Sequence, residues 1–130
     1  EIGSAYKVDE NEEEQTMDIK GRDLISGLPK VVVVDAGQIR NALKEPVSSI
    51  IESIKTTLEK TPPELAADIS DKGIIMTGGG AMLRDLDKRV EQSTGIKVTL
   101  AHDPLSCVAK GTGLSLSSLD LLETGGNFKK

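Results

Sequence analysis

The sequence predicts an α/β fold for its second half, preceded by two strands and a long helix. From about residue 61 onward, helix-like and strand-like segments alternate, which is typical of a parallel sheet with right-handed crossovers. Residues 73–77 form a continuous apolar run, as expected for a strand that is covered on both faces. Apolar residues recur at three- and four-residue steps between positions 39 and 58, which predicts one long amphipathic helix.

Composition limits the classes of protein to consider. The chain has 130 residues, of which 37% are hydrophobic, so it is long enough for one core without disulfides or a structural metal. Its formal net charge of -5 and the lack of a basic cluster argue against a nucleic acid as partner. The single cysteine, Cys107, forms no internal bridge and has no metal-binding spacing, which indicates a reducing compartment.

No segment has the length of a membrane span. The longest apolar runs, such as 31–34 and 73–76, are far shorter than the roughly 18 to 20 residues that cross a bilayer. The chain starts at Glu1 without an initiator methionine or a basic and apolar leader. We therefore expect it to be a segment of a longer protein.

Two short strands are expected near the N-terminus. Residues 9–14 are almost wholly acidic, which favours a solvated loop. The segments 16–20 and 30–34 are rich in alternating or β-branched apolar residues and predict strands. Since the turn-forming residues 26–29 lie between them, the two strands should pair in antiparallel fashion.

A long helix should begin after the second strand. Asp35 followed by Gln38 is a variant of the capping box that starts helices. The apolar stripe of the helix consists of Ile39, Leu43, Val47, Ile50, Ile51, Ile54 and Leu58. Pro46 lies inside this stripe and predicts a kink or a restart, because it lacks an N–H group. The residues 61–63 should end the helix.

The remaining elements alternate. Residues 64–70 predict a short helix with Pro63 in its first turn, and the strand 73–77 follows. Residues 81–93 have helical spacing and stop at Gly95, which is typical of a helix C-terminus.

The last part of the chain should contain a strand and a helix. Residues 96–100 predict the strand, and Asp103 followed by Pro104 predicts the start of a helix that reaches about Leu122. Residues 125–130 resemble a loose tail.

The most informative feature is the glycine turn that follows the strand 73–77. In α/β sheets, ligands bind at the carboxyl ends of strands, where glycine lets them approach the backbone closely. A structural explanation stays open, since a tight turn needs glycine for its dihedral angles alone. The turn, Gly78-Gly79-Gly80, is neither a Walker A loop nor a dinucleotide-binding GxGxxG motif.

Three blocks of sequence, 58–69, 73–80 and 103–113, together resemble the C-terminal third of the MreB family of bacterial actin homologues. The resemblance extends over essentially the whole chain. It implies the C-terminal domain of an actin-like ATPase with a ribonuclease H-like fold and a small α+β outer subdomain. In this family residues 1–41 would belong to the outer subdomain IIB, and residues 42–130 to the nucleotide-side subdomain IIA.

The resemblance also implies a cofactor. Gly78, Gly79 and Gly80 would contact the ribose and adenine of ATP, and Met82 would pack on the base. The phosphate-binding loops and the carboxylates that orient magnesium would lie in the N-terminal part of the parent protein. The resemblance therefore assigns no catalytic or metal-binding residue to this chain, which alone is not expected to hydrolyse ATP.

In the family, ATP controls assembly into filaments that direct rod cell shape and cell-wall synthesis. The implied location is the cytoplasm, at the inner face of the cell membrane, which the parent protein would contact through its N-terminal part. Implied partners are further copies of the protein and a RodZ-type membrane-anchored regulator. Gly111 and Gly113 would allow two hinge helices to pack closely.

Other interpretations stay open. The same glycine turn occurs in sugar kinases and heat-shock ATPases, so a phosphoryl-transfer enzyme is the alternative, and a partner-binding module without nucleotide is a third interpretation. The single histidine, His102, is interpreted as a surface or capping group, and Cys107 as a packing residue.

Overall fold

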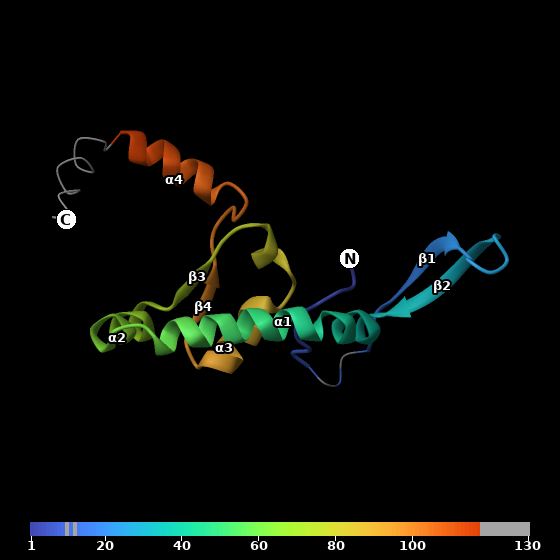
Figure 1. Cartoon of the computed structure of the whole chain (residues 1–130), viewed down its shortest axis with the longest axis horizontal. Coiled ribbons are helices and arrows are strands. Elements are labelled where there is room, and N and C mark those ends of the chain that lie inside the picture. The colour runs from blue at the N-terminus through green and yellow to red at the C-terminus, as the bar shows by residue number, and fades with distance from the viewer. Residues whose placement is uncertain (10, 12, 118–130) are drawn as a thin grey trace.

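The computed structural model describes residues 1–9, 11 and 13–117. Helix α1 runs along the long axis of the molecule, and the other elements are arranged around it (Figure 1). The elements in chain order are β1 (Thr16–Arg22), β2 (Pro29–Asp35), α1 (Ala36–Glu59), α2 (Pro63–Lys72), β3 (Ile74–Met76), the 3₁₀ helix η1 (Gly79–Met82), α3 (Leu86–Thr94), β4 (Val98–Leu100) and α4 (Cys107–Leu116).

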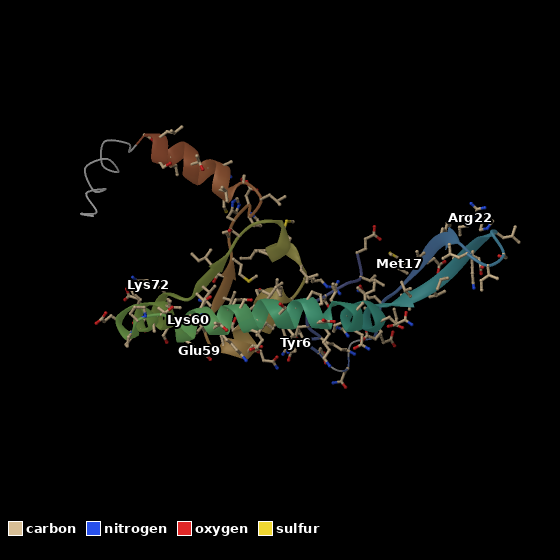
Figure 2. The ribbon with its side chains drawn as sticks, in the orientation of Figure 1. Tyr6, Met17, Arg22, Glu59, Lys60 and Lys72 are labelled. Carbon is tan, nitrogen blue, oxygen red and sulfur yellow. The ribbon has the colours of Figure 1, made fainter. Side chains whose placement is uncertain are left out.

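The first two strands form an antiparallel hairpin that projects from one end of α1 (Figure 1). The register runs from Thr16 opposite Asp35 to Arg22 opposite Pro29, which confirms the expected pairing and lengthens both strands. Met17 lies near the base of the hairpin and Arg22 near its far end (Figure 2). Backbone N–H groups in the connecting turn donate to the carboxylate of Asp23, which lowers the pKa of Asp23.

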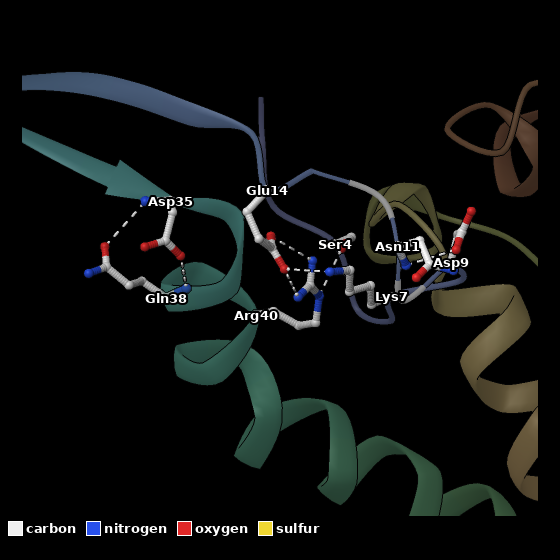
Figure 3. Close-up of polar contacts among 8 residues, drawn as sticks. All are labelled: Ser4, Lys7, Asp9, Asn11, Glu14, Asp35, Gln38 and Arg40. Atoms are coloured by element: carbon white, nitrogen blue, oxygen red, sulfur yellow. Dashed lines mark hydrogen bonds and ion pairs between the residues drawn. The ribbon is translucent and has the colours of Figure 1, made fainter.

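The predicted capping box starts helix α1. The Gln38 N–H donates to the Asp35 carboxylate at 2.7 Å, and the Asp35 N–H donates to the Gln38 side-chain oxygen at 3.2 Å (Figure 3). The helix then continues through Pro46 as one element of 24 residues, so the expected restart does not occur. Val47, which directly follows the proline, and Ile51, one turn further on, are both buried, and their packing stabilises the helix across the missing hydrogen bond.

One apolar core joins α1 to α3 and β4. Its buried members are Val47, Ile51, Leu86, Val90 and Val98. Val90 of α3 is 0% exposed, so it lies at the centre of this core. The core holds α3, β3 and β4 in a fixed position relative to the long helix α1.

Strands β3 and β4 are parallel, as expected, with Ile74 opposite Val98 and Met76 opposite Leu100. The prediction that this strand is covered on both faces is wrong for this chain, since Ile75 is 69% exposed. Successive side chains of a strand point to opposite faces. Ile74 and Met76 pack on the core, whereas the described residues leave the face of Ile75 open.

The helices α2 and α4 contribute no buried residue to the core. Pro63 occupies the first turn of α2, as predicted. The last helix begins at Cys107 rather than at Pro104, because residues 103–106 form a turn in which the Ser106 N–H donates to the Asp103 carbonyl. The expected part of this helix beyond residue 117, and the tail, lie outside the described residues.

Helix α4 has no buried residue and projects away from the rest of the molecule (Figure 1). None of the helices in the described part of the chain is long and apolar enough to cross a membrane.

The N-terminal segment packs against the body of the molecule and anchors the acidic loop. Ile2 and Ser4 are buried. Glu14 forms ion pairs with Arg40 of α1 at 3.0 Å and with Lys7 at 3.3 Å (Figure 3). The described residues before Glu14 in the acidic loop are exposed, as expected.

Replacement of the helix cap should destabilise the fold. In Asp35→Ala the first turn of α1 loses its side-chain acceptor, and we expect the free energy of unfolding to fall by about 1 kcal/mol. The matched variant Asp35→Asn keeps an acceptor and should lose much less. Urea unfolding measures both variants, and equal stability of the two would show that the cap does not contribute.

The Glu14 ion pairs should make stability depend on pH. The hydrogen bond from Arg40, followed by that from Lys7, holds the pKa of Glu14 below its ordinary value of 4.5. This contribution to stability is therefore present above pH 4.5 and is lost as the pH falls through the lowered pKa. In Glu14→Gln, the loss of stability on acidification should be shallower than in the wild type.

Urea unfolding from neutral pH to about pH 3 measures this difference. The matched control is Glu13→Gln, since Glu13 is exposed and forms no ion pair among the described residues. An identical pH profile for the Glu14→Gln variant and the wild type would contradict the expected linkage.

Candidate functional site

The glycine turn lies at the carboxyl end of β3, between the two parallel strands and the segment that follows β4. The Ala101 N–H donates to the Met76 carbonyl at 3.0 Å, just beyond the last paired residues. The Gly78 N–H donates to the Pro104 carbonyl at 2.8 Å. These two hydrogen bonds fix the turn at the edge of the sheet where ligands of α/β proteins bind.

The three glycines have different structural roles. Gly78 has φ 82° and ψ 171°, a conformation essentially restricted to glycine. A Cβ atom added at Gly79 would lie 3.4 Å from a methyl group of Leu105, whereas one added at Gly80 or at Gly78 would meet nothing within 4 Å. Gly78 is thus required by the backbone, and Gly80 leaves open space above the turn.

The predicted helix 81–93 is wrong at its start. The short 3₁₀ helix η1 follows Gly78, and α3 begins only at Leu86. Asp85 adopts a left-handed conformation with φ 61°, which separates the two helices. The carbonyl of Arg84 accepts a hydrogen bond from the Ala5 N–H at 2.8 Å. A continuous helix would use this carbonyl internally, so pairing with the N-terminal segment favours the break.

The 3₁₀ helix directs Met82 to the surface. Ala81 is 8% exposed and packs inward, while Met82 is 55% exposed. Met82 therefore follows the open glycine backbone as a flexible apolar side chain. Leu105, which is 67% exposed and contacts the glycine turn, was not predicted as a site residue. Its signal in the sequence was its place directly after Asp103 and Pro104, in a block that resembles the family.

The site suits an uncharged, flat part of a ligand. Open glycine backbone with Met82 and Leu105 beside it offers apolar contact and close approach, as the ring of a nucleoside requires. Among the described residues no group of three or more His, Cys, Asp or Glu side chains could hold a metal ion. The residues present therefore fit the adenosine of ATP, while the phosphates and magnesium would need other residues.

The site is an open surface, and two large cavities of the described chain lie elsewhere. One cavity of about 510 Å³ lies between α1, α2 and the start of β3. Another, of about 420 Å³, lies between the N-terminal segment, α1 and α3. The glycine turn lines neither of these two cavities.

The structure also places the other residues that the sequence singled out, which are Gly111, Gly113, His102 and Cys107. A Cβ atom added at Gly111 or Gly113 of α4 meets nothing within 4 Å, so their close packing on another helix stays a prediction. His102 is exposed. The Cys107 thiol lies 3.4 Å from the Asp103 carbonyl oxygen. Hydrogen bonds from Lys110 and Ser106 lower the pKa of Asp103 and hold the turn before α4.

Comparison with known proteins gives consistent matches. A family model described as MreB/Mbl protein matches residues 1–124. The cell shape-determining protein MreB of Escherichia coli (strain K12) is 46% identical over 121 residues, which cover 93% of this chain and 34% of that protein. The cell shape-determining protein Mbl of Bacillus subtilis (strain 168) is 45% identical over 108 residues, or 83% of this chain and 32% of that protein. The chain thus spans about a third of the length of these relatives.

Comparison with solved structures leads to the same family. MreB5 of Spiroplasma citri bound to ADP is 39% identical and superposes with a TM-score of 0.83, over 96% of this chain and 37% of that one. The same protein bound to AMPPNP is 38% identical, with a TM-score of 0.82 and the same coverage.

Alanine substitutions should separate the roles of the glycines. Gly78→Ala forces a Cβ into a conformation that only glycine adopts freely, and we expect it to lower the free energy of unfolding by about 1 to 3 kcal/mol. Gly80→Ala places its methyl group in open space and should leave stability nearly unchanged. Thermal unfolding of the two variants measures the difference, and equal stability would contradict the assigned backbone role of Gly78.

Proposed function

Since the chain belongs to the MreB/Mbl family of cell shape-determining, actin-like proteins, we propose that it forms the adenosine-side wall of an ATP-binding cleft. In this proposal, Gly78, Gly79 and Gly80 lie against the ribose and adenine, and Met82 packs on the base. The observation that carries the proposal is the open glycine backbone at the carboxyl end of a parallel strand. The ADP and AMPPNP bound by MreB5 of Spiroplasma citri support it.

The chemistry of the glycine turn suits the nucleoside of ATP and does not suit its phosphates. The neutral glycine turn gives contact area and lets the nucleoside approach closely, but it provides no charge for the phosphates. Charged hydrogen bonds to phosphate normally dominate nucleotide affinity. We therefore propose that the remaining two thirds of the protein supply the phosphate contacts and the magnesium site, and that this chain alone does not hydrolyse ATP.

The proposal extends to the cell. ATP binding would control assembly of the protein into filaments in the cytoplasm, at the inner face of the cell membrane, where they direct rod shape and cell-wall synthesis.

Residues 1–41 would form part of the outer subdomain and residues 42–130 the nucleotide-side subdomain. A RodZ-type membrane-anchored regulator would be a partner. Membrane contact would come from the N-terminal part of the whole protein.

The alternative, a sugar-kinase-like or heat-shock-type ATPase, receives less support because the matched relatives are cell shape-determining proteins. Sedimentation of the whole protein with ATP and magnesium separates the two functions. A filament protein should pellet above a threshold concentration. A kinase would stay in solution at every concentration and would consume ATP only with an acceptor.

A larger side chain in the glycine turn should weaken nucleotide binding without unfolding the protein. In Gly80→Val the side chain fills the open space where the nucleoside would lie. We expect the dissociation constant for ATP to rise at least about tenfold, or about 1.4 kcal/mol. Fluorescence anisotropy with a labelled ATP, measured on the whole protein, gives the affinity.

The matched control is Gly21→Val, since Gly21 lies in strand β1 and also has no neighbour within 4 Å of an added Cβ. Its affinity should equal that of the wild type. Unchanged ATP affinity in Gly80→Val, with the fold intact by circular dichroism, would refute the assignment of the glycine turn.

A further inference from the structure

A cavity of about 420 Å³ lies between the N-terminal segment, the first half of α1 and α3, and no residue of the glycine turn lines it. Three cationic side chains, Arg40, Lys44 and Arg89, line this cavity together with Tyr6. Tyr6 lies beside α1 in Figure 2. Such a concentration of positive charge is unexpected in a chain whose net charge is -5. We call this cavity the basic cavity.

The apolar core brings these cations together. Arg40 and Lys44 are four residues apart on α1, so they lie on one face of the helix. Arg89 belongs to α3 and directly precedes Val90, the most buried core residue. Like charges four residues apart on a helix are mildly destabilising. The packing of α1 against α3 therefore places the cations of both helices around one cavity, where an anion would be attracted.

Glu14 compensates only part of this charge. It pairs with Arg40 at 3.0 Å. Among the residues that the structure describes, no carboxylate oxygen lies within 4.0 Å of a side-chain nitrogen of Lys44 or Arg89. Two positive charges, one from each helix, thus remain available at the wall of the basic cavity.

Hydrogen bonds hold the ring of Tyr6 and the guanidinium of Arg89 in place. Gln92 Nε2 donates to the Tyr6 hydroxyl at 2.8 Å, and Arg89 Nη1 donates to Gln92 Oε1 at 2.7 Å. The guanidinium carbon of Arg89 lies 5.9 Å from the centroid of the Tyr6 ring. Because neutral groups fix both side chains, they are positioned for a ligand without being neutralised.

We propose that the basic cavity binds a small organic phosphate monoester. The phosphoryl dianion lies between Lys44 and Arg89, since guanidinium and ammonium groups form strong charge-assisted hydrogen bonds with phosphate. The organic part lies on the ring of Tyr6 and on Val47, which is 5% exposed at the floor. The volume exceeds what a bare phosphate needs and falls in the range of small-molecule sites, about 300 to 1,000 Å³. Such a ligand ties the N-terminal segment to α1 and α3.

Tyr6 provides a direct test, because it is the single tyrosine of a chain that has no tryptophan. We would titrate the full chain with mono-n-butyl phosphate, which does not absorb where tyrosine is excited, and follow the tyrosine emission. We expect a saturable change. Inorganic phosphate should bind more weakly than butyl phosphate, and butanol should cause no saturable change.

Substitutions test whether butyl phosphate binds in the basic cavity. Lys44→Gln and Arg89→Gln should each weaken the affinity for butyl phosphate at least about tenfold, because each loses one charged contact. The Arg89→Lys variant should keep part of the affinity for butyl phosphate that the Arg89→Gln variant loses. Lys55→Gln is the matched control, since Lys55 lies on the same helix but outside the basic cavity, and it should bind like the wild type.

Far-UV circular dichroism checks that each variant keeps its helices, and Lys44 is an exposed helix position where glutamine is well tolerated. The absence of a saturable change in the wild type would overturn the proposal. So would equal affinity of the Lys44→Gln, Arg89→Gln and Lys55→Gln variants. Equal affinity for inorganic and butyl phosphate would overturn the placement of an organic group on Tyr6.

Discussion

The packing of α1 against α3 and β4 is the interaction on which the rest of the structure depends. Val47 and Ile51 on one side and Leu86, Val90 and Val98 on the other form the only buried apolar cluster of the described residues. This cluster holds the parallel strands in register, and the strands in turn place the glycine turn at their carboxyl ends. It also brings α3 beside α1, which creates the basic cavity. Both candidate sites are therefore consequences of one core.

The open surfaces of the chain have a common physical explanation. Parallel sheets are normally covered on both faces, yet Ile75 is 69% exposed on one face of the β3 and β4 pair. Helix α4 likewise has no buried residue, and the glycine turn faces open space. The chain spans about a third of the length of its relatives, and our proposal places the rest of a nucleotide-binding protein against such surfaces. A nucleotide cleft with one wall present fits this pattern.

Local signals in the sequence were sufficient for much of the fold. The Asp35 and Gln38 capping box, the antiparallel hairpin and the start of α2 at Pro63 depend on neighbouring residues, and all three were predicted. The largest error in the helix boundaries depends on a distant contact. The helix expected from residue 81 is broken because the Arg84 carbonyl pairs with Ala5, about 80 positions away.

The candidate site, like the fold, was predictable only where neighbouring residues carry the signal. The sequence and its resemblance to a family pointed to the glycine turn, and in the structure a Cβ atom added at Gly80 would meet nothing within 4 Å. Leu105 reaches the turn through the pairing of Gly78 with Pro104, which no local pattern reveals. The basic cavity joins residues from three separate segments, so periodicity and motifs gave no sign of it.

An experimental structure of the whole protein with bound ADP shows most directly whether the glycine turn contacts the nucleotide. We expect the ribose or adenine to lie within about 4 Å of the backbone of residues 78–80, the distance of van der Waals contact. We also expect the phosphates to point away from this chain toward the rest of the protein. A nucleotide bound elsewhere, with the glycine turn covered by protein, would refute this assignment and leave the glycines with a structural role alone.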